Sequence, residues 1–352
     1  MPGFFVIEIC RHAQDAVFGR KAFAQHTPQA VQGGIQPRHV EHGLPAATAA
    51  IAAVSSFFGG LWTDRNDYPT LRASKLASGA ITTEDADRLD GWRAEGFFKV
   101  DNAIDPALID EYLNAVAALK SRSPSPLLVT SISLPRPTPY SPEVLEKSYS
   151  ARTVDDYFHL EDARRLLFHP VITDFLRLVF ERSPVLTQSL NFERGSEQAI
   201  HQDTAFVCMN APMKLIGVWI ALEDVKPGAG ELVYYPGSHR WPDYLFSNYF
   251  RHYNAERDGE AQLQHWYRWI EEEAARQGVQ RQAFLPRKGD LLFWHAALAH
   301  GGAQIGNPHA TRRSLVGHYC PTGVRPLYHY YKPAQFRRHR WRDYYYCSSY
   351  YR

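Results

Sequence analysis

The chain has few cysteines and methionines and no long apolar run. Its 352 residues include four cysteines and three methionines. The cysteines, Cys10, Cys208, Cys320 and Cys347, are widely scattered and form no CxxC pair. This spacing favours neither a disulfide framework nor a thiolate zinc site. The N-terminus has no basic segment followed by an apolar one, so we predict no secretory signal peptide.

The chain also lacks an excess of either charge. Lys and Arg total 39 against 37 Asp and Glu, which leaves a net charge of +2. Such a balance gives no general argument for nucleic acid or a membrane surface as partner. The longest weakly apolar stretch, residues 46–60, is rich in Ala and Ser and too short to span a bilayer, so we predict a packed helix there. The default expectation is a cytoplasmic protein without a membrane segment.

Helix signals dominate the first half of the chain. Thr82 precedes a helix start with acids in its first turn, and Asp105-Pro106 supplies an N-cap and a proline at the first helical position. Residues 160–180 are again helical in pattern, with a break expected at Pro170. The Pro- and Ser-rich residues 120–158 are expected to loop over the surface.

From about residue 185 the pattern changes to short β-like runs separated by Gly/Pro turns. The predicted strands are residues 185–192, 198–206, 215–222, 231–235, 290–295 and 314–319. Helices followed by strands predict an α+β protein around an antiparallel β-core.

The remaining segments complete the predicted domain organisation. Residues 1–80 show no strong period and are treated as an N-terminal extension of uncertain structure, followed by one domain over 81–352. Within that domain we expect a helical insertion at about 240–283 and a basic, tyrosine-rich tail at about 325–352.

His201 and Asp203 are separated by one residue in a predicted strand. Residues i and i+2 of a strand share a face, so the imidazole and the carboxylate would point together. Two such ligands and one more His form the facial triad typical of non-haem Fe(II) oxygenases. His300 follows the predicted strand 290–295, and Arg312 precedes the last strand. A buried Arg can bind the far carboxylate of an iron-chelating keto acid bidentately.

These ordered motifs resemble the phytanoyl-CoA dioxygenase-like branch of the Fe(II)/2-oxoglutarate oxygenases. The resemblance covers roughly residues 88–320. Its pieces are residues 90–118, His201-Gln202-Asp203, VWIALEDV around Trp219, GELVYYPGSH at 230–239, GDLLFWHAALAHGG at 289–302 and RRSLVGHY around Arg312. The resemblance implies a double-stranded β-helix (jelly-roll, cupin-like) core with iron at one mouth, flanked by N-terminal helices.

The resemblance also implies a set of site residues. The set comprises His201, Asp203 and His300 as iron ligands, Arg312 as the anchor of the 2-oxoglutarate carboxylate, and Trp219 and Gln188 as cofactor-lining residues. A family-type LxHG segment selects His300 over His295, and His295 would face the other way on a continued strand. Arg313 stays open as the anchor, because the stretch after His300 is one residue longer than expected.

Other conspicuous residues have less specific interpretations. His239 is expected to be structural or to line the substrate mouth, and His318 to be a core residue rather than a fourth ligand. The helical residues 262–276 could form a lid, an oligomer contact or a packed surface helix. The tail could bind an anionic or glycan-like substrate, could bind nucleic acid by stacking, or could dock and close the barrel.

The implied activity is that of a dioxygenase using Fe(II), 2-oxoglutarate and O₂. We expect hydroxylation of a small organic molecule of natural-product, sugar or acyl type, with release of succinate and CO₂, and the basic tail adds the hypothesis that this molecule is anionic. The retained carboxylate of Asp203 favours hydroxylation over halogenation, whereas desaturation, epimerisation and ring formation use the same ligands. Two other classes stay open: a cupin-type metalloenzyme that does not use 2-oxoglutarate, and a non-catalytic jelly-roll binding protein. The oligomeric state is not indicated.

Overall fold

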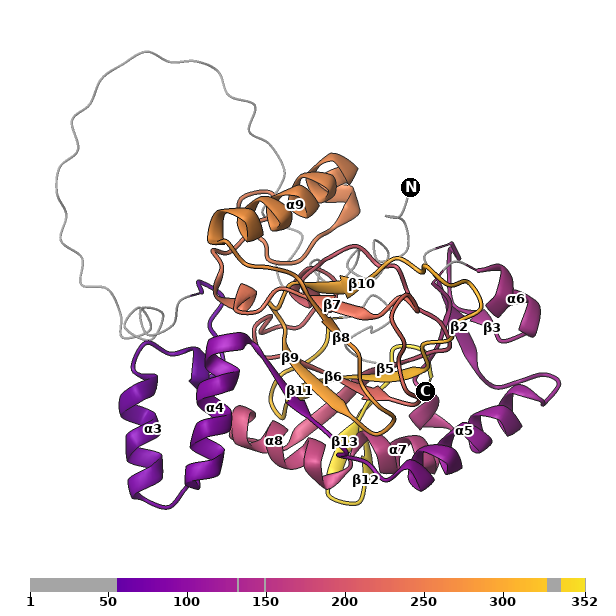
Figure 1. Ribbon diagram of the computed structural model, residues 1–352, viewed down its shortest axis with the longest axis horizontal. Helices are drawn as coiled ribbons and strands as arrows, with labels where there is room; N and C mark the ends of the chain where they lie inside the picture. The colour runs from indigo at the N-terminus through magenta and orange to yellow at the C-terminus, as the bar shows by residue number, and fades with distance from the viewer. Residues whose placement is uncertain (1–55, 132, 149, 328–336, 352) are drawn as a thin grey trace, which may run out of the picture.

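Two β-sheets of unequal size form the centre of the described chain (Figure 1). The computed structural model describes residues 56–131, 133–148, 150–327 and 337–351. The large sheet has the order β1 (Phe97–Val100), β9 (Leu291–His295), β6 (Ile216–Ala221), β11 (Ser314–Pro321), β5 (Pro184–Phe192), β4 (Arg152–Val154), β2 (Leu128–Thr130) and β3 (Thr138–Pro139). The small sheet has the order β10 (His300–Gly302), β7 (Leu232–Tyr234) and β8 (Gln282–Phe284).

Helices pack on both sides of this pair of sheets (Figure 1). Those before the core strands are α3 (Tyr68–Ala77), α4 (Thr83–Glu95), α5 (Pro106–Lys120), α6 (Pro142–Lys147), α7 (Glu161–Leu167) and α8 (Pro170–Phe180). The long helix α9 (Ala255–Gln277) lies by the small sheet, in the predicted insertion. In the described part of the chain, no helix is both long and apolar enough to cross a membrane.

Side-chain alternation along the large sheet separates two apolar layers. Val218 and Ile220 of β6 belong to the cluster formed with the N-terminal helices. Trp219 and Ala221, one residue out of phase, belong to the cluster formed with Leu232, Tyr234 and Phe284 of the small sheet. Successive strand residues point to opposite faces, so one face of the sheet carries the helices and the other lines the space between the sheets. The α+β prediction is confirmed.

The helix signals in the sequence correspond to real helix ends. The Thr82 side chain accepts a hydrogen bond from the amide of Asp85, whose carboxylate accepts one from the amide of Thr82. Asp105 caps α5, in which Pro106 is the first residue. The break expected at Pro170 is present, because α7 ends at Leu167 and α8 begins at Pro170.

Two expectations from the sequence were wrong, and a third lies mostly outside the described residues. Residues 198–206 are not a strand: they contain a single bridge between His201 and His300 and the 3-10 helix η3 (Asp203–Ala205). The segment 120–158 is not merely a loop, because β2, β3, α6 and β4 lie within it. These strands have two or three residues each, which is too short for an alternation of apolar and polar residues to stand out in a proline-rich segment. Of the helix predicted at 46–60, residues 46–55 lie outside the described residues, and 56–60 form turns.

The C-terminal tail is docked along the large sheet. Its strands β12 (His339–Trp341) and β13 (Tyr344–Tyr346) form a hairpin, and β13 pairs in parallel with β5. The amide of Leu128 donates to the Tyr351 hydroxyl over 2.8 Å. The Ser348 hydroxyl donates to the buried carboxylate of Asp155, which also accepts from the amide of Ser189. Asp155 therefore joins the tail to β5.

Asp155 should make stability depend on pH. Burial raises the pKa of its carboxyl from 3.8 to about 7, and the hydrogen bonds from Ser348 and Ser189 offset this only in part. Because the folded-state pKa exceeds the unfolded-state value, this contribution to stability is full below pH 3.8 and is lost as the pH rises through about 7. We expect Asp155→Asn to raise Tm relative to wild type more at about pH 8 than at about pH 5. Calorimetry across this range tests it, with the exposed Asp174→Asn as control; parallel Tm curves for wild type and Asp155→Asn would contradict it.

Candidate metal centre and its pocket

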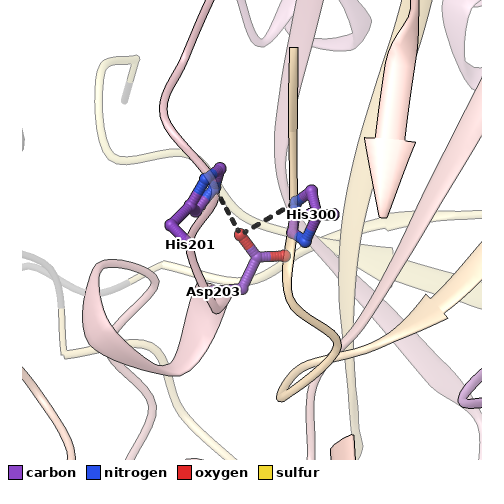
Figure 2. A group of neighbouring side chains, drawn as sticks. All are labelled: His201, Asp203 and His300. Atoms are coloured by element: carbon purple, nitrogen blue, oxygen red, sulfur yellow. Dashed lines mark ion pairs between the residues drawn. The ribbon is translucent and has the colours of Figure 1, made fainter. Parts of the chain in front are cut away.

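His201, Asp203 and His300 converge at one point between the two sheets (Figure 2). The Nε2 atoms of His201 and His300 lie 3.7 and 3.8 Å from Oδ1 of Asp203. All three side chains are buried, and their candidate ligand atoms lie within 4.8 Å of one another. Within the described ranges, no other group of three or more His, Cys, Asp or Glu residues has this geometry. The structure thus brings together the three residues predicted as ligands.

Backbone carbonyls determine which nitrogen each imidazole presents. Nδ1 of His201 lies 2.8 Å from the carbonyl oxygen of Ala199, and Nδ1 of His300 lies 2.9 Å from that of Leu298. A carbonyl only accepts, so Nδ1 carries the proton in both rings and Nε2 presents its lone pair to the centre. Burial lowers the pKa of His300 to about 4, which keeps the ring neutral. These are the tautomers that metal binding through Nε2 requires.

The carboxylate of Asp203 is oriented by a tryptophan. The indole Nε1 of Trp294 donates to Oδ2 over 2.7 Å, and Nε2 of His318 lies 3.5 Å from the same oxygen. Oδ1 is left facing His201 and His300. Burial alone would raise the pKa of Asp203, but the three surrounding imidazoles outweigh it and hold this pKa well below its usual value. The donor set is therefore two imidazole Nε2 atoms and one ionised carboxylate oxygen, which suits a divalent transition metal.

Trp294 reaches Asp203 by crossing a glycine. Gly217 of β6 pairs with Trp294 of β9. A Cβ at position 217 would lie 2.1 Å from the indole ring. The indole thus occupies the space that any other residue at 217 would fill.

A buried network that the sequence did not reveal holds the loop around the triad. Gln202 donates to the carbonyl of Ala297 over 2.7 Å, which ties the His201–Asp203 segment to the approach of His300. The buried guanidinium of Arg251 donates to Gln202 over 3.2 Å and to the Thr204 hydroxyl over 3.0 Å, and it pairs with Asp243 at 2.8 Å. Arg251 and Asp243 belong to the insertion, which shows no motif that would link it to residue 202.

Arg312 lies in a pocket that opens beside the triad. It is 2% exposed, and its guanidinium carbon lies 5.3 Å from the ring centre of Phe192 and 5.8 Å from that of Trp219. Its buried Nε has no hydrogen-bond partner, and no carboxylate of the described chain lies within ion-pair distance. Burial lowers the pKa of Arg312 to about 10, with attraction to the more distant Glu231 offsetting part of this effect, so Arg312 remains a cation. Arg313 instead lies at the surface near Glu223, so the structure places Arg312, not Arg313, in the pocket.

Trp219 and Gln188 also line the pocket, from β6 and β5. Gln188 contacts His318 through its Oε1 at 3.1 Å and donates to the Tyr350 hydroxyl over 3.3 Å. His318, expected to be a core residue and not a fourth ligand, is buried and contacts Gln188; it also lines the pocket and lies 3.5 Å from Asp203. Its place on β11 opposite Gln188 puts it on the inward face of the sheet.

The two other histidines considered from the sequence lie in a separate cluster. His295 approaches Asp64 at 3.3 Å, and its ring centre lies 5.2 Å from that of His239. Both rings are buried, and neither lines the pocket beside the triad. His295 points away from the pocket that His300 lines, as strand alternation predicted. Helix α9 packs near the pocket, with Trp266 against the pocket residue Phe206 at 5.4 Å between ring centres.

Comparison with known proteins relates this geometry to one family. Residues 92–314 match the phytanoyl-CoA dioxygenase (PhyH) family. The phytanoyl-CoA dioxygenase domain-containing protein 1 of Danio rerio is 28% identical over 102 residues, or 27% of this chain and 35% of that protein. The match thus spans about a third of that relative's length.

Solved structures share the fold at low sequence identity. The non-haem α-ketoglutarate-dependent epimerase SnoN from nogalamycin biosynthesis superposes with a TM-score of 0.51 at 20% identity, covering 69% of this chain and 86% of that one. SnoN in complex with Fe³⁺, α-ketoglutarate and nogalamycin RO also gives 0.51 at 20% identity, with 69% and 87% covered. The predicted jelly-roll, cupin-like core is confirmed.

The contact between Gly217 and Trp294 generates a stability and affinity prediction. Gly217→Ala should displace the indole, lower the free energy of unfolding by about 1–3 kcal/mol and weaken metal binding by about tenfold or more through loss of the hydrogen bond to Asp203. Thermal unfolding and Mn(II) titration followed by electron paramagnetic resonance measure the two effects. Gly91→Ala is the matched control, because Gly91 lies on the exposed face of α4 with open space around it. Unchanged Mn(II) affinity in Gly217→Ala would show that Trp294 does not set it.

Proposed function

The chain belongs to the phytanoyl-CoA dioxygenase family, and on that premise we propose that it is an Fe(II)- and 2-oxoglutarate-dependent oxygenase that hydroxylates a small organic molecule. The observation that carries the proposal is a buried His-His-Asp donor set sharing one pocket with an arginine that, among the described residues, has no carboxylate within ion-pair distance. Either feature alone would fit several functions. Together they provide for a metal and for an anion beside it.

The donor set fits iron. His201, Asp203 and His300 would hold Fe(II) through two Nε2 atoms and one carboxylate oxygen, a facial triad that leaves other positions for ligands. Both imidazoles already present Nε2. Trp294 donates a hydrogen bond to Oδ2 of Asp203, so Asp203 would bind through Oδ1 alone. When iron and 2-oxoglutarate are bound, the chemistry they supply is the reduction of O₂ coupled to loss of CO₂ from the keto acid and oxidation of the substrate.

Arg312 fits the far carboxylate of 2-oxoglutarate. A buried cation without a counterion is costly, and a bidentate carboxylate would satisfy it. Its Nε has no hydrogen-bond partner in the structure and could donate to such an oxygen. Trp219 and Phe192 flank the guanidinium, so they would exclude water from the ion pair. This cation favours a keto-acid-dependent enzyme over a cupin-type enzyme without 2-oxoglutarate and over a non-catalytic binding protein.

The substrate proposal rests on Asp203 and on the pocket walls. The carboxylate at position 203 keeps the metal's third protein ligand in place, which favours hydroxylation over halogenation. We propose a small organic molecule of natural-product, sugar or acyl type, with succinate and CO₂ as the other products. Because one fold serves many substrates, the choice among these types rests on the pocket walls and not on the family.

The cofactor assignment predicts a visible charge-transfer band when 2-oxoglutarate is titrated into anaerobic Fe(II)-loaded protein. His201→Ala should abolish the band, because a ligand is lost. Arg312→Gln should raise the 2-oxoglutarate concentration needed by about 10- to 100-fold, since charge-assisted hydrogen bonds contribute roughly 1.5–3 kcal/mol. Arg313 is the neighbouring, exposed arginine, so Arg313→Gln should need the same 2-oxoglutarate concentration as wild type.

Two results would count against the assignment. Absence of the band in folded, iron-loaded wild-type protein would exclude 2-oxoglutarate as the cofactor. Equal weakening by Arg312→Gln and Arg313→Gln would remove Arg312 as the anchor.

A further inference from the structure

The C-terminal tail supplies part of the wall of the pocket that holds the triad. Tyr350 lines this pocket together with His201, Asp203 and His300. It follows the hairpin of β12 and β13, which docks on β5. The wall of the pocket is therefore complete only when the tail is docked.

Contacts on both sides of Tyr350 fix its position. The Ser348 hydroxyl accepts hydrogen bonds from the amides of Tyr350 over 2.9 Å and Tyr351 over 3.0 Å, and it donates to the buried carboxylate of Asp155. The ring of Tyr351 stacks on that of Phe158, with 5.3 Å between the ring centres. Tyr350 thus lies between two anchored residues of the tail, so its place in the pocket depends on tail docking.

A chain of contacts leads from Tyr350 to a predicted metal ligand. Nε2 of Gln188 donates to the Tyr350 hydroxyl over 3.3 Å. Oε1 of the same amide lies 3.1 Å from Nδ1 of His318, and because an amide oxygen only accepts, Nδ1 is the donor. Nε2 of His318 lies 3.5 Å from Oδ2 of Asp203. Two side chains therefore connect the tail hydroxyl to the carboxylate of the triad.

The amide of Gln188 is the link in this chain whose orientation depends on the tail. A side-chain amide has a donor end and an acceptor end, so the partner of one end determines where the other points. The Tyr350 hydroxyl holds Nε2 toward the tail, which leaves Oε1 facing His318. Without that hydroxyl the amide can turn, and Nδ1 of His318 then loses its acceptor. The ring beside Asp203 would no longer have a fixed orientation.

We propose that Tyr350 is a positioning residue of the metal centre, which acts through Gln188 and His318 on Asp203 and so couples docking of the tail to metal binding. The inference rests on the metal-binding part of the proposed function, and it does not depend on the keto acid or on the substrate. Outer contacts of this kind orient metal ligands and influence metal affinity. The coupling is reciprocal, because an effect of the docked tail on metal affinity requires an equal effect of bound metal on docking.

The first experiment measures Mn(II) affinity of the full chain by electron paramagnetic resonance. Tyr350→Phe keeps the ring and removes the hydroxyl, so it should weaken Mn(II) binding by about two- to tenfold, the contribution of one neutral hydrogen bond. Tyr344→Phe is the matched control, because this tail hydroxyl donates to Thr173 over 3.0 Å and the described pocket lining does not include Tyr344. It should bind Mn(II) like wild type.

A double-mutant cycle tests whether Tyr350 acts through Gln188. In a Gln188→Ala background, Tyr350→Phe should cause no further loss of Mn(II) affinity, because the link is already absent. An undiminished effect of Tyr350→Phe in that background would overturn the proposal. Mn(II) affinity equal to wild type in the single variant Tyr350→Phe would overturn it as well.

The second experiment measures tail docking by hydrogen exchange. In wild type, the amides of residues 343–351 should exchange about two- to tenfold more slowly with saturating Mn(II) than without it, and Tyr350→Phe should lose this difference. The amides of α5 serve as the internal control and should exchange at the same rate in both conditions. Tail exchange that is unaffected by Mn(II) in wild type would contradict the coupling.

The outcomes separate this inference from the cofactor assignment. If wild type binds Mn(II) with the predicted effects but forms no charge-transfer band with Fe(II) and 2-oxoglutarate, the cofactor assignment fails and the role of Tyr350 stands. If the band forms and Tyr350→Phe binds Mn(II) like wild type, only the role of Tyr350 is overturned. If wild type binds no metal, both are wrong.

Discussion

The hydrogen bond from Trp294 to Asp203 is the interaction on which the candidate site depends. An ionised carboxylate buried between two sheets needs a partner for each oxygen, because an unsatisfied buried charge is costly. The indole satisfies Oδ2 and thereby directs Oδ1 toward His201 and His300. That arrangement is possible because position 217 is glycine, so the ring can cross the neighbouring strand.

The large sheet also connects the site to the rest of the fold. One of its faces packs against the N-terminal helices, and the other lines the pocket, so the apolar core and the site share the same strands. Beyond β5 the sheet continues into β4 and β2, with the docked tail beside them. Of the pocket residues, His300 lies on β10 and Arg152 on β4, whereas His201, Asp203, Arg312 and the tail residue Tyr350 lie outside the strands. The pocket is thus built from strands of both sheets and from loops and the tail.

The insertion after β7 contacts the chain segment that carries His201 and Asp203. Arg251 holds Gln202 and Thr204, the residues on either side of Asp203 along the chain, and its charge is balanced by Asp243. Such outer contacts orient metal ligands and influence metal affinity. The loop around His201 has little regular structure of its own, so these hydrogen bonds replace the strand that the sequence suggested.

The sequence by itself determined the helices with clear caps, the α+β class and the order of the candidate site residues, because those signals are local or lie within short motifs. It did not determine the shape of the 198–206 segment, where the spacing of His201 and Asp203 suggested a strand and the chain forms a loop and a 3-10 turn. It left open which of Arg312 and Arg313 anchors the keto-acid carboxylate, because the two adjacent arginines differ in their burial, which the sequence does not show. Only the tertiary structure placed His318 against Asp203, Arg251 behind Gln202 and Arg152 in the pocket. Each of these contacts joins segments far apart in the chain, and no local periodicity encodes such a pairing.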